Sequence, residues 1–227
     1  MNRPNPTSPG PLPSPISGPE DFARAFIVSR ETIDQLKIYV SLLAQWQPRI
    51  NLVANATLSE VWHRHIADSA QIVALAPPAP RTWLDLGSGG GFPGLVVAIM
   101  LHGAGTRVTL VESDRRKSAF LAEVARQTGI TVEIQTARIE QTATQGMLGA
   151  VDVVSARALA PLVRLISLSL PFYGDDTIGI FPKGRAAETE IEEARAAWAF
   201  DVETIPSLTD EAARIVLVRH PRAITEG

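Results

Sequence analysis

The segment Leu84–Leu95 (LDLGSGGGFPGL) places four glycines within five positions, directly after an apolar run. Glycine loses the most conformational freedom on folding, so this density predicts a backbone that must approach another group closely or adopt positive φ angles. A tight turn between a strand and a helix would need only some of these glycines. The segment therefore predicts a loop whose bare main chain binds a ligand.

Two kinds of ligand fit this loop. Gly89, Gly91 and Gly94 match the GxGxxG pattern of dinucleotide-binding folds, in which an acid about 20 residues later binds the ribose. Glu112 has that spacing. This interpretation predicts NAD or a related dinucleotide, although a single match to the pattern has low specificity.

The loop also matches Asp-x-Gly-x-Gly-x-Gly, the form common in S-adenosylmethionine sites, through Asp85, Gly87, Gly89 and Gly91. Here the glycines let the backbone approach the methionine portion and the ribose, and Asp85 is placed for the ammonium group. Glu112 accepts hydrogen bonds from the ribose diol. Dehydrogenases usually add a substrate domain, for which this chain has no room, so the architecture favours S-adenosylmethionine.

The elements that position this loop alternate in type after Pro80. Short apolar runs predict strands at 82–86, 107–112, 131–135, 151–156, 177–182, 200–206 and 213–219. Helical spacing predicts helices at 93–102, 115–127, 161–170 and 186–198. Apolar strands joined by helices indicate a parallel sheet covered on both faces, and the last two strands, without a helix between them, should pair antiparallel. We predict the doubly wound, seven-stranded α/β sheet of class I methyltransferases, a Rossmann-like fold.

A Pro-rich tail and a helical extension precede the predicted sheet. In the extension, Ser29 is the expected N-cap of a helix that stops at Pro48, and Thr57 with Glu60 forms a capping box for the next helix. The tail buries little and should be disordered. We thus predict a disordered tail (1–19), an N-terminal helical extension (20–80) and an S-adenosylmethionine-binding domain (81–227).

Composition excludes several classes of function. The chain has no cysteine, and therefore no disulfide, thiolate zinc site or thiol nucleophile. No apolar run approaches the roughly 20 residues of a membrane span, and the N-terminus lacks a signal-peptide pattern, so we expect a cytoplasmic protein. His63 and His65 point to different faces of a predicted helix, and we expect no metal. His65 falls on the apolar face of that helix, so we expect it to be packed in the core.

Several motifs in register resemble the RsmG family, also called GidB. The resemblance runs from about Ile33 to the C-terminus. Its motifs are INLVANAT, RHIADS, DLGSGGGFPGLVVAI, ESDRRKSAFL, TARIE, VVSARALAPL and FPKGR, in this order. They occur at the spacing expected for the family.

The resemblance implies a bacterial enzyme that methylates N7 of a guanine in the helix 18 loop of 16S ribosomal RNA. It implies S-adenosylmethionine contacts at Gly87, Phe92, Ile139, Glu140 and Arg157. Family members often carry Asp where Glu112 stands, and the longer acid still reaches a ribose diol. Together with the loop pattern, the predicted cofactor-binding residues are Asp85, Gly87, Gly89, Phe92, Glu112, Ile139, Glu140 and Arg157.

The chemistry of N7 methylation agrees with the residues present. C5 methylation of pyrimidines uses a cysteine, which is absent, and exocyclic amine methylation commonly uses (N/D)PP(Y/F), where this chain has Ser155–Ala158. N7 of guanine carries a lone pair and no proton, so its methylation needs orientation rather than a general base. We therefore assign no catalytic residue.

Four basic residues are candidates for RNA contact. Arg115 and Arg116 begin a predicted helix, where positive charge opposes the helix dipole, and Lys183 and Arg185 follow the fifth strand. Lys183 faces either a substrate phosphate or solvent. Arg157 suits the methionine carboxylate, guanine O6 or an ion pair at the sheet edge.

The formal net charge of −3 limits nonspecific attraction to RNA. We therefore expect recognition of a folded shape, with 16S ribosomal RNA or the small ribosomal subunit as partner and a monomeric protein. Two rival hypotheses remain open from the residues: a small-molecule methyltransferase of the same fold, and a noncatalytic RNA-binding assembly factor that retained the cofactor pocket.

Overall fold

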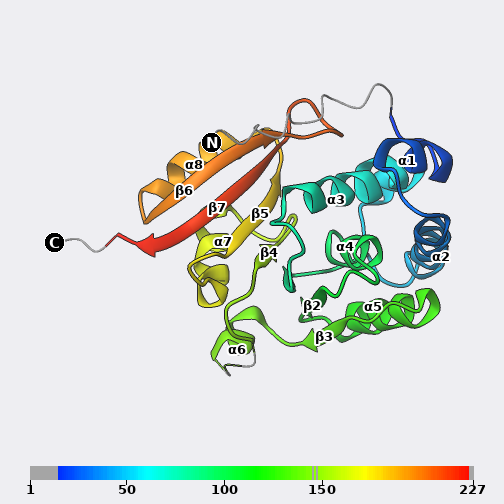
Figure 1. Ribbon diagram of the computed structural model, residues 1–227, viewed down its shortest axis with the longest axis horizontal. Helices are drawn as coiled ribbons and strands as arrows, with labels where there is room; N and C mark the ends of the chain where they lie inside the picture. Colours follow the sequence, from blue (N-terminus) through cyan, green and yellow to red (C-terminus); the bar gives the residue numbers. More distant parts are fainter. Residues whose placement is uncertain (1–14, 145, 147, 225–227) are drawn as a thin grey trace.

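The computed structural model describes residues 15–144, 146 and 148–224 (Figure 1). Most of the predicted disordered tail, residues 1–14, lies outside the described residues. The predicted boundary at residue 19 is too late, because Ile16 is buried in the apolar core. The Ile16 amide donates a hydrogen bond to His63 Nδ1 at 3.2 Å. The packed part of the chain therefore begins before the first helix.

The centre of the molecule is one seven-stranded sheet with the order β3-β2-β1-β4-β5-β7-β6 (Figure 1). Strands β1 to β5 are parallel, and β7 pairs antiparallel with both β5 and β6. This confirms the predicted class I methyltransferase sheet. The strands are β1 (Thr82–Leu86), β2 (Arg107–Glu112), β3 (Glu133–Thr136), β4 (Val153–Ser155), β5 (Ile178–Lys183), β6 (Trp198–Pro206) and β7 (Arg214–Ala223).

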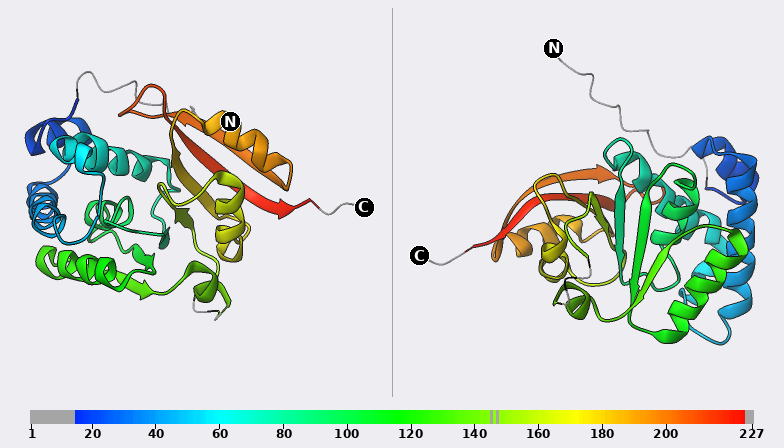
Figure 2. Two further views of the ribbon diagram at one scale, coloured as in Figure 1. Left: turned by 180° about the vertical axis from the view of Figure 1, so that it is seen from behind. Right: turned by 60° about the horizontal axis from the view of Figure 1, so that its bottom comes forward.

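Helices cover both faces of the sheet, as Figure 2 shows. Side chains alternate along each strand, so Trp83 belongs to the core on one face and Leu84 to the core on the other. The first core lies under α4 (Gly94–Met100), α5 (Arg115–Thr128) and the N-terminal extension. The second lies under α7 (Leu162–Ser169) and α8 (Ala187–Arg195), with Ile139 of the short helix α6 (Ile139–Thr144).

The extension begins with α1 (Pro19–Phe26) and α2 (Arg30–Trp46). The Ser29 hydroxyl accepts a hydrogen bond from the Thr32 amide at 3.1 Å, which confirms the predicted N-cap. Helix α2 ends just before Pro48, also as predicted. Because Leu36 and Leu43 join the same apolar cluster as Trp83, the extension shares its core with the sheet.

The prediction of one regular helix from Thr57 onward is wrong. The segment consists of a 3₁₀-helix (Asn55–Glu60), a π-helix (Trp62–Ala67), α3 (Asp68–Ala70) and a second 3₁₀-helix (Gln71–Leu75). The Thr57 hydroxyl forms hydrogen bonds with the Ala54 carbonyl and His65 Nε2 instead of capping a helix. π-helical turns are rare and are found frequently at functional sites.

Candidate functional site

The glycine loop follows β1 at the carboxyl end of the parallel strands, where doubly wound folds bind ligands. Gly87 has a φ of +67° and Gly89 a φ of +55°. A Cβ atom at residue 87 would lie 2.6 Å from Leu159 Cδ1, so this position needs glycine for its conformation and for its contact. At residue 89 the nearest atom to such a Cβ is the Gly87 carbonyl oxygen at 3.7 Å. The backbone at Gly89 therefore has free space beside it.

Glu112, at the end of β2, holds the glycine loop in place. Its Oε2 accepts a hydrogen bond from the Gly89 amide at 2.8 Å, and its Oε1 accepts one from the Asp114 amide at 2.8 Å. The side chain is buried but lines the cavity beside the loop. A carboxylate has about four lone-pair sites, so each oxygen keeps one for a further donor such as a ribose hydroxyl.

Asp85 does not face this cavity. Its side chain is fully buried beneath the loop, where Oδ1 accepts from the Ser155 hydroxyl at 2.7 Å and Oδ2 from the Gly94 amide at 3.3 Å. Burial raises the pKa of the Asp85 carboxyl to about 6. The sequence-based assignment of Asp85 as a contact for the ligand ammonium group is therefore corrected: Asp85 positions the loop from below.

A cavity of about 530 Å³ lies against the glycine loop. Such a volume is typical of small-molecule sites. The bare loop, the Glu112 carboxylate and the buried Ile139 side chain fit a ligand with a ribose diol and an apolar ring. All the predicted cofactor-binding residues except Asp85 line this cavity, namely Gly87, Gly89, Phe92, Glu112, Ile139, Glu140 and Arg157.

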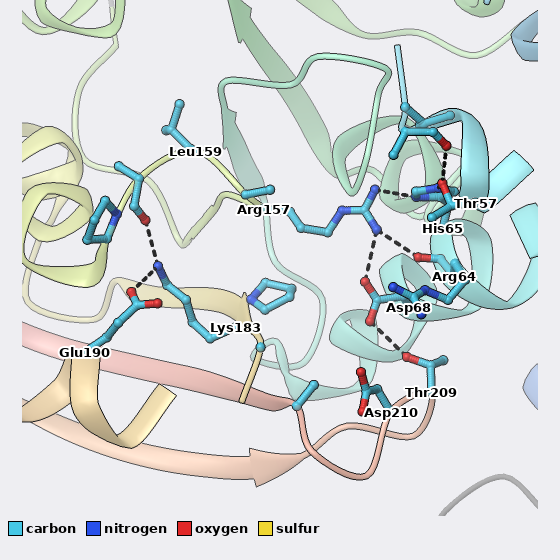
Figure 3. A pocket seen from close by; sticks show the side chains of 18 of the residues that line it. Thr57, Arg64, His65, Asp68, Arg157, Leu159, Lys183, Glu190, Thr209 and Asp210 are labelled. Carbon is cyan, nitrogen blue, oxygen red and sulfur yellow. Dashed lines mark hydrogen bonds and ion pairs between the residues drawn. The ribbon is translucent and has the colours of Figure 1, made fainter. Parts of the chain in front are cut away.

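Arg157, just after β4, is held by the N-terminal extension (Figure 3). Its Nη1 donates to the Arg64 carbonyl at 3.1 Å and to Asp68 Oδ2 at 3.0 Å, and its Nη2 donates to His65 Nδ1 at 2.9 Å. The guanidinium carbon also lies 5.1 Å from the centre of the Phe92 ring. The ion pair that sequence analysis left as one alternative is therefore present, and it joins the extension to the sheet.

His65 is buried, as predicted, but within this polar network. Burial and then the charges of Arg157 and Arg64 lower its pKa to about 3, so the ring is neutral near pH 7. Arginine only donates, so Nδ1 accepts and Nε2 carries the proton that is donated to the Thr57 hydroxyl at 2.7 Å. The ring also stacks on Phe92, with 4.9 Å between the two ring centres.

The Arg157 network predicts a measurable loss of stability in Arg157→Lys. Lysine keeps the charge but cannot reproduce the fork that donates to Arg64, His65 and Asp68. We expect the free energy of unfolding to fall by about 1–3 kcal/mol in urea denaturation. The control is Arg126→Lys, whose pair with Glu123 is exposed and should change stability by less than about 0.5 kcal/mol. Equal losses in both variants would contradict the network.

Figure 3 shows a second cavity, of about 720 Å³, which adjoins the first through shared lining residues. The two cavities share Leu52 and the segment Arg157–Ala160. Ala158 in this segment has a φ of +53°, a strained conformation for a non-glycine residue, and strain of this kind clusters at functional sites. The second cavity is therefore the space directly next to a ligand bound at the glycine loop.

Lys183 lines the second cavity but faces neither a free phosphate site nor solvent. Its Nζ donates to the Ala160 carbonyl at 2.7 Å and to Glu190 Oε2 at 2.7 Å, and its side chain is only 10% exposed. Glu190 Oε2 also accepts from the Leu162 amide at 2.8 Å. Lys183 therefore fixes the backbone between the two cavities. This role differs from both predicted alternatives, contact with a substrate phosphate and exposure to solvent.

The other predicted RNA-contact residues lie on the surface. Arg115 and Arg116 are exposed at the start of α5, and Arg185 is exposed between β5 and α8. Asp114 caps α5 and pairs with Arg116, with 3.2 Å between Nη2 and Oδ2, a role that was not predicted from the sequence. This acid offsets the unfavourable placement of positive charge at the helix start. RNA contact by these arginines stays a prediction.

Two residues of the extension that complete the glycine loop were also missed. The buried Tyr39 hydroxyl donates a hydrogen bond to the Gly90 carbonyl, and a Cβ atom at Gly90 would lie 3.0 Å from the Leu52 carbonyl oxygen. Leu52 falls within the motif INLVANAT, so the signal was present without an assigned role.

In the described residues no group of three or more His, Asp or Glu side chains could hold a metal ion. Nor is any described helix both long and apolar enough to cross a membrane.

Comparison with known proteins decides the family. The model of GidB, rRNA small subunit methyltransferase G, matches residues 32–216. The chain belongs to this family. It is 51% identical to the ribosomal RNA small subunit methyltransferase G of Parvibaculum lavamentivorans, covering 88% of each chain, and 49% identical to that of Rhodospirillum centenum, covering 95% of this chain and 98% of the relative.

Solved structures show the same fold at low identity. An O-methyltransferase from Bacillus cereus in complex with SAH has a TM-score of 0.59 at 13% identity, covering 88% of this chain and 96% of that chain. A methyltransferase from Geobacter sulfurreducens has a TM-score of 0.57 at 13% identity, covering 81% and 88%. These likenesses support the class I methyltransferase fold.

Proposed function

We propose that this member of the rRNA small subunit methyltransferase G family transfers a methyl group from S-adenosylmethionine to N7 of a guanine in 16S ribosomal RNA, in the helix 18 loop. The observation that carries the proposal is the pair of adjoining cavities, one beside the glycine loop and one beyond Arg157–Ala160. The first has the size and donor set for the cofactor, and the second gives room for an acceptor base. Such an enzyme acts on ribosomes in the cytoplasm.

When bound, the cofactor supplies an electrophilic methyl group on a sulfonium centre. The loop backbone at Gly87 and Gly89 and the Glu112 carboxylate would hold that ligand. Phe92 lies between the rings of Tyr39 and His65, with centre separations of 5.1 and 4.9 Å, which fixes the cavity wall. Because guanine N7 carries no proton, these residues need only position the two reactants, a contribution that can reach about 7–11 kcal/mol.

The neutral state of His65 agrees with this mechanism. With its pKa lowered to about 3 and both ring nitrogens engaged by Arg157 and Thr57, it has no lone pair available as a base. The network is instead a support that keeps Phe92 and Arg157 in place.

Methyl transfer to ribosomal subunits tests the proposal. Small subunits from cells that lack the gene, incubated with labelled S-adenosylmethionine and the protein, should gain one 7-methylguanosine in 16S ribosomal RNA. Subunits from cells with the gene should gain none, because the position is already modified. Label in metabolites instead of RNA would favour the small-molecule rival, and cofactor binding without any turnover would favour the noncatalytic assembly factor.

A further inference from the structure

The second cavity contains a carboxylate without a cationic partner. Its acidic side chains are Asp68, Glu190 and Asp210. Asp68 pairs with Arg157 and Glu190 pairs with Lys183. Asp210 Oδ1 accepts one hydrogen bond, from the Ala212 amide at 2.9 Å, and in the described part of the chain Asp210 forms no ion pair. In Figure 3 the Asp210 side chain points from the loop between β6 and β7 into the cavity.

The loop that carries Asp210 is fixed by the N-terminal extension. The Thr209 hydroxyl donates to Asp68 Oδ1 at 3.0 Å, the Leu208 amide donates to Gln71 Oε1 at 2.7 Å, and the Thr209 carbonyl oxygen lies 2.9 Å from His63 Nε2. These bonds anchor Leu208 and Thr209, the two residues directly before Asp210. Asp210 is therefore presented from a rigid support, which is what a specific contact requires.

Asp210 lines the second cavity but not the cavity of the glycine loop. A guanine that reacts at N7 must turn N7 toward the shared segment Arg157–Ala160. N7 and the N1–H and 2-amino groups lie on different sides of the purine, so those donors then face walls that belong to the second cavity alone. The position of Asp210 fits these donors.

We propose that Asp210 accepts hydrogen bonds from N1–H and the 2-amino group of the acceptor guanine and thereby sets the preference for this base; the inference rests on the proposed function. Two carboxylate oxygens match two parallel donors. Asp210 is exposed in the free protein. Adenine presents a lone pair at N1 and no 2-amino group, so the carboxylate would face an acceptor and receive no hydrogen bond, and a site that reads donors rejects a base without them. Enzymes that act on an extruded base read its Watson–Crick edge in this way.

The charge of Asp210 also suits the reaction. The N7 lone pair forms the new bond to the methyl carbon, and the electron pair of the broken carbon–sulfur bond stays on sulfur. No proton leaves, so one positive charge moves from the sulfur to the purine. An unpaired carboxylate beside the purine stabilises that charge, whereas the acids already paired with Arg157 and Lys183 contribute less.

Replacing one partner on each side of the contact tests the proposal. The substrate is the small subunit assembled with guanosine or with inosine, which lacks the 2-amino group, at the mapped target position. For the natural enzyme we expect kcat/KM to be about 10- to 100-fold lower on inosine, and for Asp210→Ala about 10- to 100-fold lower on guanosine. For Asp210→Ala, kcat/KM on inosine should be nearly the same as on guanosine, because the contact with the 2-amino group is already absent.

Glu211→Ala is the matched control, since it removes a neighbouring exposed acid that does not line the cavity and should leave both rates unchanged. The affinity of each variant for adenosylhomocysteine shows whether it is folded. If Asp210→Ala is not folded, Asp210→Asn replaces it in the same comparison. The inference would be overturned if the inosine substitution and Asp210→Ala lowered kcat/KM independently, so that their effects multiplied. It would also be overturned if Asp210→Ala kept kcat/KM within twofold of the natural enzyme. Absence of 7-methylguanosine with the natural enzyme would instead overturn the proposed function.

Discussion

Gly89→Val should reduce the affinity for adenosylhomocysteine at least 100-fold. A Cβ atom at this position meets no protein atom closer than 3.7 Å, so the side chain would project into the cavity rather than clash with the fold. The φ of +55° adds strain for a β-branched residue, of about 1–3 kcal/mol. The glycine pattern alone predicts a loss of cofactor affinity in a largely intact fold. The structure adds a loss of thermal stability, and calorimetric titration with thermal denaturation measures both.

Gly129→Val separates the two effects. Gly129 ends α5 with a φ of +71° and has open space around it, but it does not line the cavity. The same substitution there should lower the melting temperature to a similar extent and leave the affinity for adenosylhomocysteine unchanged. If Gly89→Val kept its affinity within a few-fold, or if Gly129→Val lost as much, the glycine loop would not be the cofactor site.

Local sequence patterns were sufficient for much of the fold. The predicted strands at 82–86 and 107–112 coincide with β1 and β2, because each is a buried apolar run bounded by residues that interrupt it. Helix α6 was missed, since Ile139–Thr144 is short and rich in Thr, which has a low helix propensity. The mixed helical segment after Asn55 was missed because its hydrogen bonds depend on contacts with distant residues.

The candidate site, like the fold, was only partly predictable from the sequence. The loop and Glu112 were predictable because strand order alone brings them together. The partners of Arg157 were not, since Asp68 lies 89 positions away and is brought there by the packing of the extension. The orientation of Asp85 had a usable signal. It lies two residues after Trp83, on the face of β1 that packs under α4, and both side chains bond to the Ser155 hydroxyl.

Two buried groups make opposite contributions to stability between about pH 4 and 6. Burial raises the pKa of Asp85 to about 6 in the folded chain, against about 3.9 when unfolded. In this range the unfolded chain ionises while the folded chain keeps its proton, so the free energy of unfolding falls as pH rises. Burial, with Arg157 and Arg64, lowers the pKa of His65 to about 3. Here the unfolded chain binds a proton that the folded chain does not, so the free energy of unfolding rises with pH.

Each contribution approaches about 1.4 kcal/mol per pH unit, so the two nearly cancel in the natural protein. Asp85→Asn removes the falling contribution, and its free energy of unfolding should rise by about 2 kcal/mol more than that of the natural protein from pH 4 to 6. His65→Gln removes the rising contribution and should show the reverse. Urea denaturation at pH 4, 5 and 6 measures both slopes. The double variant should regain the natural slope, and single variants that stay parallel to the natural protein would show that neither group titrates as the structure implies.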